Sequence, residues 1–92
     1  MTHSIYKYQL EIQDYQEVRL PQGAEILTVQ EQYGIPCLWA RVNTEESRVT
    51  HRTIAMHGSG HEMSQPTVEA EKYIGTFQIH SGSLVFHVFE SI

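Results

Sequence analysis

Apolar and polar residues alternate with a period of two along most of the chain. In IYKYQLEI, residues 5–12, the side chains of Tyr6, Tyr8, Leu10 and Ile12 fall on one side, and charged or amide side chains fall on the other. Successive side chains of a strand point to opposite faces, so this pattern predicts a half-buried β-strand. The same alternation predicts strands at residues 17–20, 25–33, 37–42 and 48–56.

The strongest signal lies at the C-terminal end, in YIGTFQIHSGSLVFHVFES. It predicts two strands rich in aromatic and β-branched residues, joined by a hairpin turn at residues 80–83. Both faces of the last strand are apolar, which predicts a central position in its sheet. His87 lies inside this strand, so its imidazole needs a hydrogen-bond partner or a ligand.

The alternation fades between Gly58 and Lys72, where QPTVEAEK allows a short helix after Pro66. Many short strands, frequent turn signals and no long helix are typical of antiparallel β proteins. The sequence therefore predicts a single all-β domain over residues 1–92, a small antiparallel β-sandwich or barrel of about six to eight strands.

The single cysteine, Cys37, excludes an intramolecular disulfide. A core this small then depends on packing, a metal or self-association, and we expect a homo-oligomer. The N-terminal residues lack the basic and apolar regions of a secretory signal, and the longest apolar stretch is far shorter than a membrane span. These features predict a soluble protein of a reducing cytoplasm.

The charge balance is acidic, with 6 Lys and Arg against 11 Asp and Glu and a formal net charge of −5. Such a chain repels nucleic acid polymers and anionic membranes, and we expect neither as a partner. A small anionic ligand remains open, because local cations and backbone N–H groups act at contact range.

Five segments, LPQGAEILTVQ, PCLWA, GSGH, YIGTFQ and LVFHVFE, cover nearly the whole chain. Together they resemble a short domain family of unknown function that occurs in many bacteriophage genomes. The resemblance implies a phage accessory protein that acts in the host cytoplasm. The family more often has Thr at the position of Ser59, which keeps a hydroxyl, and an aliphatic residue at the position of Arg41.

The segment MHGSGHE raises three possibilities for His57, Gly58, Ser59, Gly60 and His61. Two glycines around a hydroxyl residue leave backbone N–H groups to converge on an anion, with imidazoles on either side. The same glycines could mark only a bulge or a tight turn. A metal site is not expected, because two histidines four residues apart converge on a helix, which Gly-Ser-Gly disfavours.

Trp39 and Arg41 occupy alternate positions of one predicted strand. A flat aromatic ring beside a guanidinium can hold a nucleobase and its phosphate. The competing interpretation places Trp39 at the centre of the core, where its N–H needs an acceptor. Gly75, in the middle of another predicted strand, leaves a gap that a ligand, a neighbouring backbone or an aromatic ring can enter.

Catalysis is not predicted, because Ser59 lacks the Gly-x-Ser-x-Gly pattern and an acid that would orient a base. No cofactor is expected. Ser59 and its neighbours His57, Gly58, Gly60 and His61, with Trp39 and Arg41, predict a non-catalytic binder of a small anionic, nucleotide-type ligand. With these residues, the resemblance to a phage family implies a protein that sequesters a signalling nucleotide of bacterial immunity. The alternative is a protein-interaction module, either an inhibitor of a host defence protein or a minor virion component.

Overall fold

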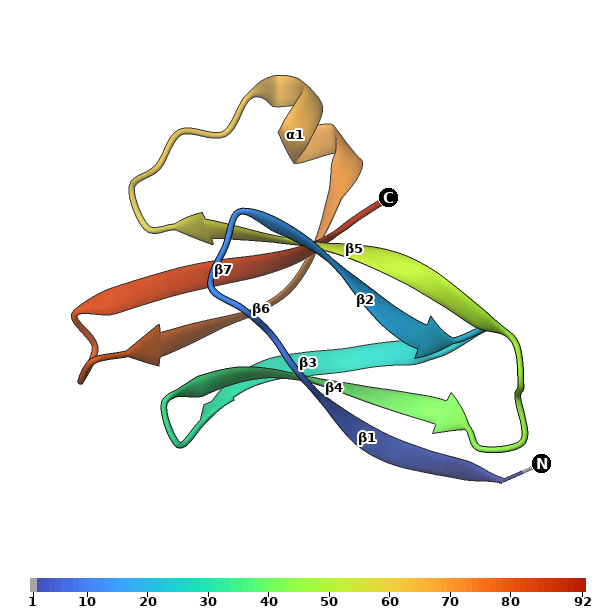
Figure 1. Cartoon of the computed structure of the whole chain (residues 1–92). Helices are drawn as coiled ribbons and strands as arrows, with labels where there is room; N and C mark the ends of the chain where they lie inside the picture. Colours follow the sequence, from blue (N-terminus) through green and yellow to red (C-terminus); the bar gives the residue numbers. More distant parts are fainter. Residues whose placement is uncertain (1) are drawn as a thin grey trace.

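The computed structural model describes residues 2–92, which form seven strands and one short helix (Figure 1). Their bounds are β1 His3–Gln9, β2 Tyr15–Pro21, β3 Glu25–Gln32, β4 Ile35–Asn43, β5 Val49–Gly58, α1 Gln65–Ala70, β6 Glu71–Ile79 and β7 Leu84–Ser91. Sheet A has the order β1-β4-β3 and sheet B the order β2-β5-β7-β6, with every neighbouring pair antiparallel. The predicted small antiparallel sandwich is confirmed.

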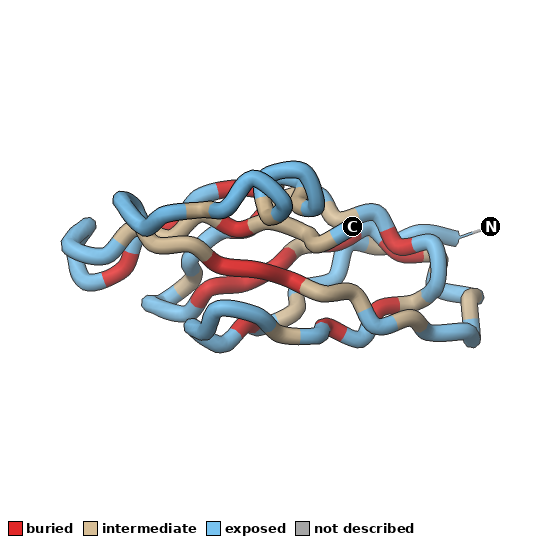
Figure 2. The backbone as a smooth tube through the Cα atoms, turned by 90° about the horizontal axis from the view of Figure 1, so that it is seen from above, coloured by how far each residue is buried: buried red, intermediate tan, exposed pale blue. Residues whose placement is uncertain are grey.

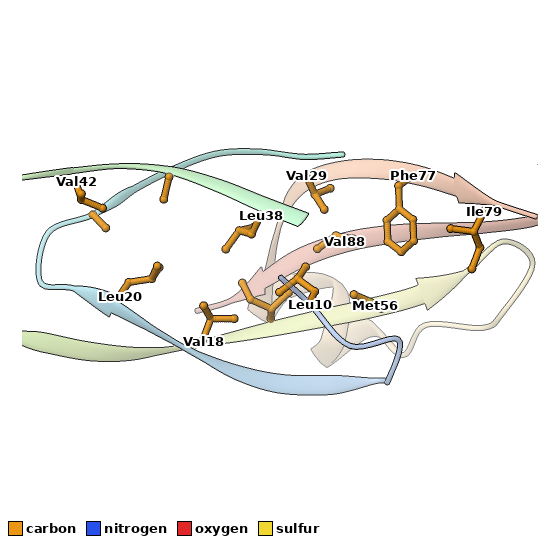
Figure 3. Close-up of a cluster of buried hydrophobic side chains, with 13 residues drawn as sticks. Leu10, Val18, Leu20, Val29, Leu38, Val42, Met56, Phe77, Ile79 and Val88 are labelled. Atoms are coloured by element: carbon orange, nitrogen blue, oxygen red, sulfur yellow. The ribbon is translucent and has the colours of Figure 1, made fainter. Parts of the chain in front are cut away.

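The core lies between the two sheets, where inward side chains from edge and central strands of both sheets meet (Figure 3). On β4 the alternate residues Leu38, Ala40 and Val42 are almost wholly buried, as the period-two pattern predicts. Burial is concentrated in the middle of the strands, and the turns are exposed (Figure 2). Strand β7 runs between β5 and β6, so its predicted central position in the sheet is also confirmed.

Strands β3 and β6 close one long side of the sandwich at Gly75. A Cβ atom built at Gly75 would lie 3.0 Å from Cγ1 of Val29, tighter than ordinary van der Waals contact. The register of β6 against β7 also shifts between Tyr73 and Gly75, which marks a bulge. The gap predicted at this glycine is therefore occupied by a side chain of the facing strand.

Trp39 lies on the outer face of sheet A, because its neighbours Leu38 and Ala40 point into the core. The interpretation of Trp39 as the centre of the core is wrong, since the alternation along β4 carries it to the opposite face. The ring is half-buried, and its Nε1 is shielded from solvent without a hydrogen-bond partner among residues 2–92.

The segment between β5 and β6 contains the predicted short helix. Ser64 caps α1, since its hydroxyl accepts a hydrogen bond from the Thr67 N–H at 3.3 Å, and Pro66 lies in the first turn. The segment leaves the end of β5, arches away from sheet B and returns at Glu71 (Figure 1). Among residues 2–92, no helix has the length and apolar character needed to cross a membrane.

Candidate functional site

The stretch Gly58–His61 forms a tight turn at the end of β5. The His61 N–H donates to the Gly58 carbonyl at 3.1 Å, and Gly60 has φ of +86°. A type II turn requires positive φ at its third residue, which glycine adopts without a steric penalty. The turn interpretation of these glycines is therefore correct.

Backbone hydrogen bonds occupy most of the N–H groups that an anion cradle would need. The Ser59 N–H donates to the Val85 carbonyl on β7 at 3.1 Å, and the His61 N–H is used within the turn. The Gly60 N–H makes no hydrogen bond to another of residues 2–92. One backbone donor, rather than a converging set, is thus available to a ligand.

The Ser59 side chain belongs to a chain of hydrogen bonds that runs across sheet B. Its Oγ lies 2.7 Å from Nε2 of His87, and Nδ1 of the same ring lies 3.0 Å from Oγ1 of Thr76. The Thr76 Oγ1 in turn lies 2.6 Å from the Tyr73 hydroxyl. Thr76 and His87 are directly opposite in the β6–β7 register, which places both side chains on one face.

Both ring nitrogens of His87 therefore have protein partners, as its place inside β7 predicts. A neutral imidazole donates from one nitrogen and accepts at the other, and a protonated imidazole donates from both. Hydroxyls can donate or accept, so this chain accommodates every protonation state of His87 without an unpaired ring nitrogen.

His57 has a different partner. Its Nε2 lies 2.7 Å from Oε1 of Glu71, and the two side chains are only 15% and 2% exposed. The rings of Tyr15 and Phe89 meet the His57 ring edge-on, with centroids 6.5 and 5.5 Å away. His57 is therefore bound to a buried carboxylate and enclosed by aromatic rings.

His61 turns back over the backbone of its own turn. A Cβ atom at Gly58 would lie 3.0 Å from Cε1 of the His61 ring, so the ring covers the glycine closely. The residue is exposed. The two histidines that flank Gly-Ser-Gly in the sequence are thus separated, with His57 in the sheet and His61 at the surface.

A hollow of about 230 Å³ lies beside the turn and the first residues of β7. It is lined by Gly58, Ser59, His61, Ser83, Leu84, Val85 and Phe86. The end of β5 and the start of β7 lie side by side here, since Gly58 pairs with Phe86 (Figure 1). Two hydroxyls and an imidazole therefore face an apolar wall, and no carboxylate is among the described lining residues.

Two larger hollows of residues 2–92 contain acidic side chains. The hollow of about 670 Å³ includes Glu31, and that of about 490 Å³ includes Glu25 and Glu90. In the second, the guanidinium of Arg52 is bound to the Glu90 carboxylate and to the Ala24 carbonyl. The hydrogen bond to Glu90 raises the pKa of Arg52 and neutralises its charge. Lys72, the other cation of this hollow, shares it with a second carboxylate, that of Glu25. The hollow at the turn is the better place for an anion.

The structure does not bring Trp39 and Arg41 to this turn. Both lie on the outer face of sheet A, whereas His57 and His87 lie on the outer face of sheet B, because Met56 and Val88 point into the core. The Arg41 guanidinium forms an ion pair with Glu25. A shared nucleotide site for these two residues and Ser59 is therefore not formed within one copy.

The site that the structure does form includes residues beyond the predicted set. Thr76, Ser83 and His87 join Gly58, Ser59 and His61, and of these three additions only His87 carries a sequence signal, as a histidine inside an apolar strand.

Within residues 2–92, no cluster of three or more His, Cys, Asp or Glu side chains is arranged to hold a metal ion.

Comparison with known proteins identifies the family but not the activity. The model of a domain of unknown function (DUF7352) matches residues 1–92, so the chain belongs to that family. A search of curated proteins gives no match. A search of solved structures gives none either.

Proposed function

Because the family carries no assigned activity, the role has to follow from the site, and we propose that the protein captures a small anionic ligand at the turn of Gly58–His61. The observation that carries this proposal is the carboxylate-free hollow in which Ser59, Ser83 and His61 meet. Hydroxyls and an imidazole are suitable donors to a phosphate, and the apolar wall suits a base or another flat group.

Protonation of His87 favours an anion at Ser59. A protonated ring donates from Nε2 to the Ser59 Oγ and from Nδ1 to the Thr76 Oγ1. The Ser59 hydroxyl proton is then free to point at a bound oxyanion, to which the Gly60 N–H adds a second donor. An anion at Ser59 should therefore bind more tightly when His87 is protonated.

The size of the hollow limits the ligand. Pockets that enclose a whole drug-sized ligand usually have about 300–1,000 Å³, and this one has about 230 Å³. One copy of the chain therefore encloses a phosphate with part of a nucleoside, but not a whole dinucleotide. A larger signalling nucleotide requires a second copy, which agrees with the self-association expected of so small a core.

In this role the protein is a phage accessory protein that sequesters a nucleotide-type signal of bacterial immunity in the host cytoplasm. The support for this biological setting is the resemblance to a phage family, and the support for the ligand class is the chemistry of the hollow. A binder of this kind acts by stoichiometric capture, which suits a small rigid domain.

A second candidate is a protein-interaction role for the outer face of sheet A, and the specific observation is the position of Trp39. The ring is half-buried beside Ile5, which is 57% exposed, rather than in the core. Lys7, Arg41 and Glu25 give this face a small positive charge in a chain of net charge −5. A positive face attracts an acidic surface, so the partner that we assign to it is an acidic surface of a host defence protein.

Thermal shift tests the ligand proposal. The wild-type protein is melted with inorganic phosphate, ADP-ribose derivatives and cyclic dinucleotides, at a pH near 6 and again near 8. A ligand at 100 times its Kd adds about 2.7 kcal/mol to the free energy of unfolding. We expect a shift that is larger at the lower pH. Absence of any shift with the whole panel would favour the interaction role instead.

The variant Ser59→Ala makes this test specific. Loss of one hydrogen bond should weaken binding by about 0.5–1.5 kcal/mol. Ser47→Ala is the matched control. Ser47 is an exposed serine in the loop that precedes β5, whereas the turn of Gly58–His61 lies at the other end of this strand. Equal shifts in the two variants would show that the ligand binds elsewhere.

A further inference from the structure

We propose that Ser59 is a reactive nucleophile, activated by His87, that accepts an acyl or phosphonyl group from a small electrophile in the adjoining hollow. This goes beyond the binding role, and it does not require that the turn hold an anionic ligand. It also differs from the expectation of no catalysis, which rested on the missing Gly-x-Ser-x-Gly pattern and the missing acid.

The geometry has the parts that an activated serine requires. The nucleophile and its base are within hydrogen-bond distance, with Ser59 Oγ 2.7 Å from His87 Nε2. A third group orients the base, since Thr76 Oγ1 lies 3.0 Å from His87 Nδ1. In the reactive form the neutral ring carries its proton on Nδ1, donates it to Thr76, and accepts the Ser59 proton at Nε2.

The surroundings of Ser59 add two further elements. The side chain is exposed and borders the hollow, so an electrophile can reach Oγ. The N–H of the residue after the nucleophile often stabilises the oxyanion in serine hydrolases, and here that residue is Gly60, whose N–H has no partner among residues 2–92. The apolar wall of Leu84, Val85 and Phe86 suits a short acyl chain.

The transfer step is balanced in atoms and charge. Ser59 Oγ attacks the carbonyl carbon of an ester, or the phosphorus of a fluorophosphonate, and its proton moves to His87 Nε2. The new Oγ–C or Oγ–P bond replaces the bond to the leaving group. The proton then passes from His87 to the departing alkoxide, phenolate or fluoride, which restores the neutral imidazole.

The charged and titratable groups around His87 come from three elements. His57 lies directly across on β5, where it is bound to Glu71 at the start of β6. Tyr73 and Thr76 approach from β6, and His61 lies in the turn after β5. Glu71 is directed to His57, so the two direct side-chain partners of His87 are the neutral hydroxyls of Ser59 and Thr76. Labelling of Ser59 should therefore rise with pH, opposite to the pH dependence proposed for anion binding.

Covalent labelling tests this proposal in the intact chain. The protein is incubated with a fluorophosphonate probe and separately with p-nitrophenyl acetate, and the adducts are located by peptide mass spectrometry. Ser83 is the internal control, because it is an exposed serine of the same hollow and its hydroxyl makes no hydrogen bond to an imidazole among residues 2–92. We expect Ser59 to be labelled at least about a hundredfold faster than Ser83, the lower end of general-base assistance.

Variants separate the base from the positioning residue. His87→Gln should reduce labelling of Ser59 to the rate of Ser83, whereas Thr76→Val should slow it and change its pH profile, and Thr76→Ser should restore it. Equal labelling of Ser59 and Ser83 in the wild-type protein, or a rate that does not rise with pH, would overturn the proposal even if a variant fails to fold. Phosphate-induced thermal shifts measure the binding role separately, so a negative labelling result leaves that role standing.

Discussion

His57 and His87 face each other on neighbouring strands of sheet B, yet their surroundings differ. His57 is bound to the carboxylate of Glu71, whose side chain is only 2% exposed. The His57 ring itself lies between two aromatic rings. His87 is bound to the hydroxyls of Ser59 and Thr76. The same residue type in the same register therefore has a structural role on β5 and a chemically adaptable one on β7.

The difference shows how the partner of an imidazole determines what the imidazole can do. A buried carboxylate needs a hydrogen-bond donor. Loss of the His57 contact would therefore leave Glu71 without its partner at a site that water solvates poorly. Hydroxyls exchange donor and acceptor roles at little cost, so His87 can gain or lose a proton while both contacts remain. The predictions below test this contrast.

The largest effect is expected from His57→Ala. The substitution leaves the Glu71 carboxylate buried without its partner and removes the ring between Tyr15 and Phe89. It should lower the free energy of unfolding by about 2–3 kcal/mol, measured by urea denaturation. The double variant His57→Ala with Glu71→Ala should recover part of the loss, and a single variant as stable as the wild type would contradict the structural role.

A second comparison uses two glycines with the same backbone geometry. Gly60 has φ of +86° and Gly23 has φ of +80°, and a Cβ at either position would meet no atom within 4 Å. Valine at each should cost about 1–3 kcal/mol of stability from backbone strain alone. Only Gly60→Val should also abolish the phosphate-induced thermal shift. If Gly60→Val folds and binds as well as Gly23→Val, the segment is only a turn.

Thr76→Val should have a smaller effect on stability than His57→Ala. It removes one neutral hydrogen bond at Nδ1 of His87, which is worth about 0.5–1.5 kcal/mol, and valine fits a strand well. The urea midpoint should therefore move only slightly. A loss as large as that of His57→Ala would show that the two histidines are equally structural.

The smallest effect concerns a surface ion pair far from both histidines. Arg48 donates three hydrogen bonds of 3.0 Å to Glu46, two from its guanidinium and one from its backbone N–H, and they lower the pKa of Glu46 from 4.5 to about 2. Since the folded pKa is below the unfolded one, this stabilisation is present above pH 4.5 and is lost as the pH falls towards 2. Carboxyl NMR titration should show the low value, and Arg48→Gln should return it towards 4.5.

Much of the fold could be predicted because alternation is a local property of the sequence. Leu38 and Val42 on β4 show their burial through period two alone. Strand β7 does not, since Val88 is the buried residue among its eight. The same alternation places Trp39 outside, but the usual role of a lone tryptophan favoured the core. That interpretation gave the residue type more weight than the alternation along β4, and the alternation was the correct guide.

The candidate site could be predicted only in part, because its contacts join distant residues. The turn follows from Gly58 and Gly60, but the partner of Ser59 is 28 positions away on β7. Nothing local distinguishes His87, bound to Ser59, from His61, which is closer in the chain. The antiparallel pairing of β5 with β7 decides between them, and pairing is a property of the whole sheet.

Histidine ring NMR tests the central claim most directly. The ring nitrogens of selectively ¹⁵N-labelled protein are followed at about pH 6, where imidazoles change charge readily, while inorganic phosphate is added. The account predicts that the His87 ring signals move with phosphate and that those of His57 stay fixed, with Ser59→Ala reducing the response of His87. Signals of His57 that move as far as those of His87, or a His87 ring that does not respond, would contradict it.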